Sequence, residues 1–160
     1  MTNQAQSTSS SACDTNAQVT SESELERLCK AVRAGNKAAL FDALAQADIG
    51  IVIVEFDGYG DSGQIEDVTA YDARDVVLKL PSRSIEIGHV QLGSLNIVRE
   101  TLTVRDAIEH LAYDVLERTH GYWEDNLGAY GDFVFDVAKR SITLNYHERV
   151  ETSEYTKHVF

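Results

Sequence analysis

The chain has 160 residues, of which 43% are hydrophobic, and its 26 acidic and 14 basic residues give a formal net charge of −12. This length suits one ordinary domain with a core of its own. The negative charge repels phosphate backbones and anionic lipid, so we expect neither direct nucleic-acid binding nor membrane binding, and it favours a basic protein surface as partner.

The first twenty residues are polar and contain a single charged residue, Asp14. Such a composition predicts a disordered tail over residues 1–20 and a single domain over residues 21–160. The chain shows neither a secretory signal nor an apolar run near the ~20 residues that span a bilayer, so a cytoplasmic location is the default expectation. Cys13 and Cys29 are the only cysteines and lack the spacing of a zinc site.

The first helix signal is a capping box from Ser23 to Glu26, which predicts that a helix begins at Ser23. Gly35 and Asn36 predict a break, after which Asn36 caps a second helical segment. Apolar residues at helical spacing predict one face packed on a sheet. They are Leu25, Leu28, Cys29, Val32, Leu40, Phe41 and Leu44.

Residues 49–56 contain four consecutive β-branched residues, and a stretch that is apolar on both faces predicts a central strand. Gly58, Gly60 and Gly63 predict a turn wider than the two-residue hairpin type. Residues 64–71 alternate enough to return as an antiparallel strand.

The middle of the chain predicts a strand pair, residues 76–80 and 84–92, on either side of the only proline. Thr103, with Asp106 three residues further on, predicts the start of a helix that ends near residues 119–121.

Residues 132–137 and 141–147 alternate on either side of a short turn, which predicts a final hairpin. The order of helices, strands, helix and hairpin predicts an α+β fold. We expect an antiparallel sheet of two or three hairpins with helices packed on one face.

Three stretches have a distinctive glycine-rich and acidic character: VEFDGYGDSGQIED, WEDNLGAYGDFVFDV and ITLNYHERVETSEYTKHVF. With them the chain resembles an uncharacterised family of small bacterial proteins of unknown function, often predicted on plasmids and other mobile elements. The resemblance covers most of residues 40–160 and implies no established activity, catalytic residue or ligand. It does imply an accessory role on a mobile element, such as blocking a host defence or regulating transfer.

Carboxylates gather around the glycine turn and in the loop before the final hairpin. Glu55 and Asp57 share one side of the first strand because strand side chains alternate. If the two hairpins lie beside each other in one sheet, the polar residues of both loops converge at one end. These residues are Glu55, Asp57, Asp61, Glu66, His120, Glu124, Asp125 and Asp132.

One interpretation of this cluster is a divalent-metal site formed by Asp57, Asp61 and Glu66, because Mg²⁺ and Ca²⁺ prefer oxygen ligands. The spacing departs from that of a calcium loop, since Ser62 and Val68 stand where such a loop has glycine and glutamate. The alternative is that the acids only shape the turn by capping backbone groups beside glycines.

A catalytic interpretation would use His120 or a glutamate as general base, with a metal or Asn126 stabilising developing charge. Hydrolase, zinc-protease and P-loop motifs are absent from the sequence. The letters GYGDSG fit the dinucleotide pattern G-x-G-x-x-G, but a dinucleotide loop opens a helix, whereas this stretch continues as a strand between acids that repel phosphate.

The loop before the final hairpin is also aromatic, with Tyr122, Trp123 and Tyr130. These side chains either close the end of the core or form a binding patch for a protein partner.

Three functions remain open from the sequence. The first is a non-catalytic acidic protein that occupies a basic site on another protein, such as one that normally holds nucleic acid. The second is a divalent-metal-binding module or a metal-dependent hydrolase, with Mg or Ca as its ion. The third is a purely structural subunit of a complex.

Overall fold

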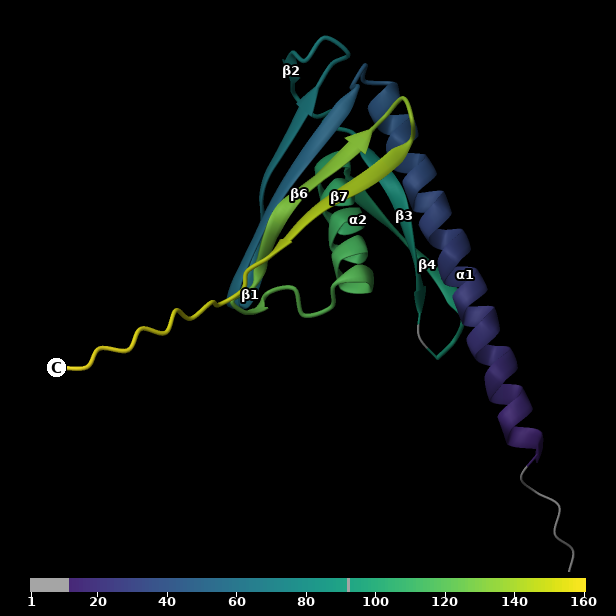
Figure 1. Cartoon of the computed structure of the whole chain (residues 1–160). Helices are drawn as coiled ribbons and strands as arrows, with labels where there is room; N and C mark the ends of the chain where they lie inside the picture. Colours follow the sequence, from purple (N-terminus) through teal and green to yellow (C-terminus); the bar gives the residue numbers. More distant parts are fainter. Residues whose placement is uncertain (1–11, 92) are drawn as a thin grey trace, which may run out of the picture.

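The computed structural model describes residues 12–91 and 93–160 (Figure 1). The elements in chain order are α1 (Ala12–Ala45), β1 (Ile51–Tyr71), β2 (Val77–Leu78), β3 (Ser84–Gln91), β4 (Asn96–Thr103), α2 (Val104–Thr119), β5 (Asp125–Asn126), β6 (Ala129–Asp136) and β7 (Ser141–Glu148). The main sheet has the order β2-β1-β6-β7, with β5 also paired to β1, and β3 and β4 form a separate two-stranded sheet. All pairings in both sheets are antiparallel, so the α+β prediction is confirmed.

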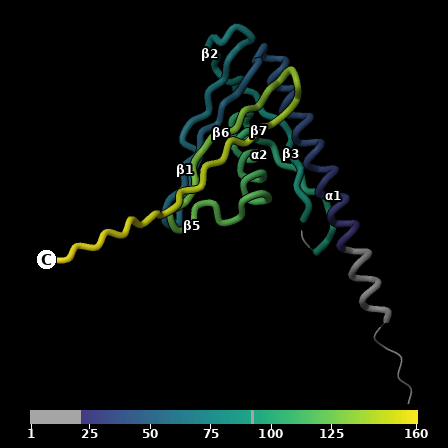
Figure 2. Tube along the Cα trace, viewed as in Figure 1, coloured from purple at the N-terminus to yellow at the C-terminus, as the bar shows by residue number. Residues whose placement is uncertain are grey.

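Strand β1 folds back on itself. The Gly50 N–H donates a hydrogen bond to the Tyr71 carbonyl over 2.8 Å. Gly50 directly precedes β1 and Tyr71 is its last residue, so the two ends of the strand lie side by side. Figure 1 and Figure 2 show β1 running to one end of the sheet and returning toward β2. Gly60, where the chain reverses, has φ +80°, a backbone conformation that glycine adopts without strain. The predicted hairpin is confirmed.

The first half of β1 is central, as predicted. It pairs with β6 from Ile51 opposite Asp136 to Asp57 opposite Tyr130. The second half lies on its other side and reaches β2 at its end.

The core lies between the main sheet and the two helices, which lie on the same side of it (Figure 1). Alternate sheet residues point inward because strand side chains alternate between faces. The largest side chains that are fully buried here belong to the main sheet, to α1 and α2 and, with Ile87, to β3. They include Phe41, Leu40, Leu44, Val52, Val54, Ile108, Leu116, Phe133 and Phe135.

Helix α1 begins earlier than predicted, at Ala12 rather than Ser23. Residues 12–20 of the predicted tail belong to this helix, and residues 1–11 lie outside the described part of the chain. The stretch from 12 to 34 contains neither glycine nor proline, so helix formed downstream can propagate through it at little cost.

The predicted break at Gly35 and Asn36 is wrong, because α1 continues through both residues. Asn36 is buried and does not cap a helix. Its side-chain amide donates to the Gly88 carbonyl and accepts from the Gly88 N–H, both over 2.8 Å. Packing against β3 therefore overrides the local preference of these two residues for a helix end.

The predicted pairing of residues 76–80 with 84–92 is also wrong. Strand β3 pairs instead with β4, from Ser84 opposite Thr103 to Gln91 opposite Asn96, and β2 pairs with the end of β1. A short loop joins β3 to β4, and closing a short loop costs less entropy than a distant pairing. Residue 92, the last of the predicted strand, lies outside the described residues.

Helix α2 and the final hairpin of β6 and β7 are confirmed near their predicted positions. Among the described residues, no helix is both long enough and apolar enough to cross a bilayer.

Thr103 caps α2, because its hydroxyl oxygen accepts a hydrogen bond from the Asp106 N–H over 3.1 Å. We expect Thr103→Ala to lower the free energy of unfolding by about 1 kcal/mol, measured by urea denaturation. Thr101→Ala is the matched control, since Thr101 is exposed on β4 two residues earlier. Equal losses in the two variants would contradict the capping role.

Candidate functional site

The face of the main sheet turned away from the helices carries the first set of predicted site residues. We call it the open face. Its side chains alternate along each strand with those that are buried under the helices. On β1, β6 and β7 they are Ile51, Ile53, Glu55, Asp57, Tyr130, Asp132, Val134, Thr143, Asn145 and His147.

Three carboxylates lie in a row across the open face. The register places Glu55 opposite Asp132, and Asp132 opposite Asn145. On the other half of β1, Glu66 follows Gly63 by three residues as Glu55 precedes Gly58 by three, and one indole packs against both glycines, so we place Glu66 beside Glu55. Directly opposed side chains on neighbouring strands have Cβ atoms about 4.5–5.5 Å apart. We call Glu66, Glu55 and Asp132 the acid row.

The fold-back has independent support from the packing of Trp123. Its ring lies against both Gly58 and Gly63, one on each half of β1. A Cβ added to Gly63 would fall 2.2 Å from this ring, so the two glycines allow one indole to cover both halves of the hairpin.

The acid row has no neutralising cation. Among the described residues, none of its three carboxylates forms an ion pair. Two of them instead accept hydrogen bonds from amides. Asn145 donates to Asp132 over 2.9 Å, and Gln64 donates to Glu66 over 3.0 Å. Within the described part of the chain, no cation therefore offsets the charge of the row.

The neighbouring row is neutralised. Asp57 forms an ion pair with Arg149 at 2.6 Å, and the Arg149 guanidinium lies 4.8 Å from the centre of the Tyr130 ring. Tyr130 stacks in turn on His147, with 5.0 Å between ring centroids. Asp57 therefore stabilises this end of the sheet and is not a free carboxylate.

Sequence reasoning missed Asp67. Burial along the second half of β1 shifts by one residue at Glu66 and Asp67, which are exposed in succession, and this is the pattern of a β-bulge. The bulge adds a further acid beside the row, and Thr69 donates a hydrogen bond to Asp67. The signal in the sequence is the pair of adjacent acids inside an alternating strand.

The aromatic loop before β6 closes the core at the end of the sheet. Trp123 is only 6% exposed and meets Phe56 edge-on, with 5.4 Å between ring centroids. His120 stacks on Tyr146 at 3.7 Å, whereas Tyr122 is 83% exposed. Trp123 is thus a core residue and is not part of a surface patch.

Three groups of the loop and the sheet have a shifted pKa or an unsatisfied atom. Burial, followed by the negative charges of Glu148 and Glu124, raises the pKa of Tyr146 above its usual range. One carboxylate oxygen of Glu124, Oε2, is buried without a hydrogen-bond partner. On the sheet, a hydrogen bond from the Lys139 ammonium lowers the pKa of Asp136.

The predicted metal site at Asp57, Asp61 and Glu66 is not assembled. Asp57 is held by Arg149, Asp61 lies at the turn opposite Asp125 of β5, and Glu66 belongs to the acid row. Within residues 12–91 and 93–160, no three His, Cys, Asp or Glu side chains are placed to hold a metal ion. The acids of the two loops therefore meet in part, as Glu55 with Asp132, but not around a common centre.

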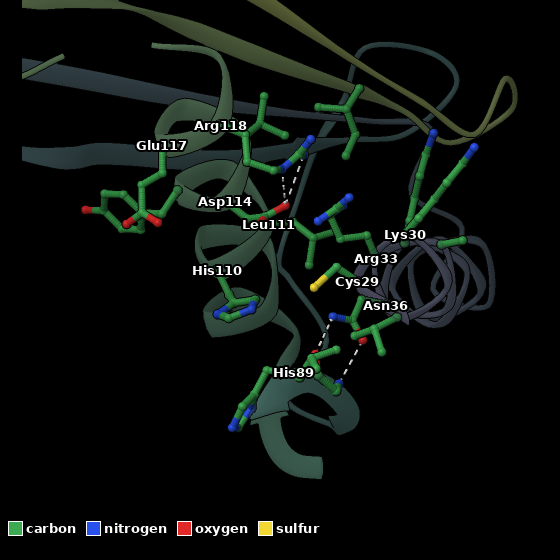
Figure 3. A pocket seen from close by; sticks show the side chains of 18 residues that line it. Cys29, Lys30, Arg33, Asn36, His89, His110, Leu111, Asp114, Glu117 and Arg118 are labelled. Atoms are coloured by element: carbon green, nitrogen blue, oxygen red, sulfur yellow. Dashed lines mark hydrogen bonds and ion pairs between the residues drawn. The ribbon is translucent and has the colours of Figure 1, made fainter. Parts of the chain in front are cut away.

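A second feature, missed from the sequence, is a groove of about 550 Å³ between α1 and α2 (Figure 3). Figure 3 shows Cys29 and Arg33 pointing from α1 toward α2, where Asp114 and Arg118 form an ion pair at 3.0 Å. On its α1 wall, Lys30, Arg33 and Lys37 recur at helical spacing beside the apolar stripe. This spacing is the signal for the groove that the sequence contains.

Residues 32–160 match the model of a family described as "Family of unknown function (DUF6878)". No curated protein and no solved structure matches the chain.

Proposed function

Because the chain belongs to this family of unknown function, DUF6878, we propose its function from its geometry: it is a non-catalytic acidic protein whose open face binds a basic surface on another protein. In the finer form of the proposal, it is a mobile-element accessory factor, and the site that it occupies normally holds nucleic acid. The acid row carries the proposal.

The acid row costs stability in the free protein. Like charges directly opposite each other on neighbouring strands repel, and Glu55 has an acid on each side. Features that work against stability persist where they serve binding. A partner that brings cations to the row offsets the repulsion between its carboxylates. The loss of this repulsion makes the free energy of association more favourable.

The spacing of the row suits a compact basic patch. Neighbouring strands lie about 4.7–4.9 Å apart, which is close to one carboxylate per strand along the row. A nucleic-acid duplex carries one charge per ~1.7 Å, a higher density. The row therefore carries charge less densely than a duplex does, and it matches a few clustered lysines or arginines. Beside it, Tyr130 is 44% exposed and offers apolar contact area.

A capture experiment tests this proposal. Immobilised protein is exposed to a bacterial lysate, and bound proteins are eluted with rising salt. We expect the wild type to retain a basic protein that salt releases, and Glu55→Gln/Asp132→Asn to lose it. Glu22→Gln/Glu26→Gln is the matched control, because it removes the same charge from exposed positions on α1. Equal capture by both double variants, or the absence of any basic protein, would contradict the proposal.

The finer proposal has its own test. If the partner's site normally holds nucleic acid, duplex DNA should displace the captured partner in proportion to its concentration. Simultaneous binding of both would contradict the nucleic-acid part of the proposal and leave the basic-surface part intact.

We predict that Glu55→Gln stabilises the free protein, because it removes two like-charge contacts. The expected gain in the free energy of unfolding is about 0.5–1 kcal/mol by urea denaturation at low salt, and it should shrink as salt rises. Glu86→Gln is the control: it also lies on a strand, but pairs with Arg99 at 3.9 Å, so it should not gain. A loss of stability in Glu55→Gln would show that the row is not repulsive.

A further inference from the structure

The groove between α1 and α2 concentrates positive charge in an acidic protein. Lys30, Arg33 and Lys37 line it from α1, where their spacing of three and four residues places them on one helix face. Among the described residues, none of the three forms an ion pair with an acid. With 26 acids and 14 bases in the chain, three uncompensated cations on one wall are an exception to its overall charge.

The opposite wall adds little negative charge to offset them. Asp114 of α2 is neutralised by Arg118, and Glu117 is the other acid of the lining. His89 and His110 complete the polar part of the lining and can donate hydrogen bonds. The groove as a whole is therefore electropositive.

Most of the remaining lining is apolar. It includes the half-buried Cys29 and the side chains Val32, Leu111, Val115 and Ile142. A volume of about 550 Å³ lies in the range of small-molecule sites, which are mostly apolar with a few placed polar groups.

Two parts of the lining are held in place by contacts within the protein. Asn36 of α1 holds β3 through its two hydrogen bonds to Gly88, and Arg118 is held on α2 by Asp114 (Figure 3). A preformed site loses less conformational entropy on binding.

We propose that this groove binds a small organic anion with an apolar body, such as an aromatic carboxylate. The anionic group would lie against Arg33 and Lys30, and the apolar body would cover Val32 and Leu111. This site lies on the helix side of the sheet and is separate from the acid row, so it goes beyond the proposed function.

The test uses 1-naphthoate as probe and the full chain carrying Cys13→Ser, so that Cys29 is the single thiol. We expect saturable binding in isothermal titration calorimetry. We also expect naphthoate to slow the modification of Cys29 by the neutral reagent N-ethylmaleimide severalfold, because the probe covers the thiol. The uncharged analogue 1-naphthamide should bind at least about tenfold more weakly, since it lacks the charge that the cations recognise.

Matched charge reversals locate the binding site. Arg33→Glu, and separately the exposed Lys30→Glu, should weaken naphthoate binding at least about tenfold, whereas Arg27→Glu should change it less than about twofold. Arg27 lies on the same helix outside the groove and pairs with Glu24. Lack of saturable binding, equal binding of the amide, unprotected Cys29, or equal effects of the reversals at 27 and 30 would each overturn the proposal.

Discussion

Trp123→Ala is expected to lower the free energy of unfolding by about 3–5 kcal/mol, as measured by urea denaturation. The indole is buried, meets Phe56 edge-on, and lies against Gly58 and Gly63 on the two halves of the β1 hairpin. Its removal leaves a cavity that this hairpin cannot fill, because glycines line it.

Tyr122→Ala is the control for this loss. Tyr122 precedes the tryptophan in the same loop but is 83% exposed, so we expect a change within about 0.5 kcal/mol. Similar losses in the two variants would mean that the loop, and not the indole, carries the stability.

Asn36→Leu is expected to cost about 2–4 kcal/mol of unfolding free energy. The leucine fills a similar volume but leaves the Gly88 N–H and carbonyl without their partners in a partly buried place. Each such unsatisfied group costs about 1–3 kcal/mol. Thermal or urea denaturation measures the loss.

Gly35→Ala is the matched control on the same helix and has the opposite expected sign. Gly35 is exposed, and a Cβ added there would meet nothing within 4 Å. Alanine should therefore stabilise α1 by about 0.5–1 kcal/mol. A loss of stability in Gly35→Ala would contradict a continuous α1, because it would show that residue 35 needs the freedom of glycine.

Local sequence patterns were enough to predict most elements. A pattern of only a few residues predicted each of three elements: the β-branched run predicted β1, the Thr103 cap predicted α2, and the alternation predicted β7. They also predicted that Glu55 and Asp57 share a face, since strand alternation requires it.

What could not be predicted depends on distant contacts. Nothing near Asn36 shows that its amide binds Gly88, so the helix was predicted to break there. Nothing near Asp57 shows that Arg149 neutralises it. Predicting the acid row would have required the register of β1 against β6. Hydrogen bonding between the strands sets that register, and composition does not show it.

The proposed acidic binding role rests on contact between the acid row and lysines of a partner. Carbodiimide cross-linking of the captured complex, followed by mass spectrometry, tests this directly, because the reagent joins carboxylates to amines that touch. We predict that cross-links start from Glu55, Glu66 or Asp132 and disappear in Glu55→Gln/Asp132→Asn. Cross-links confined to carboxylates away from the open face, such as Glu22 and Glu26 of α1, would contradict it.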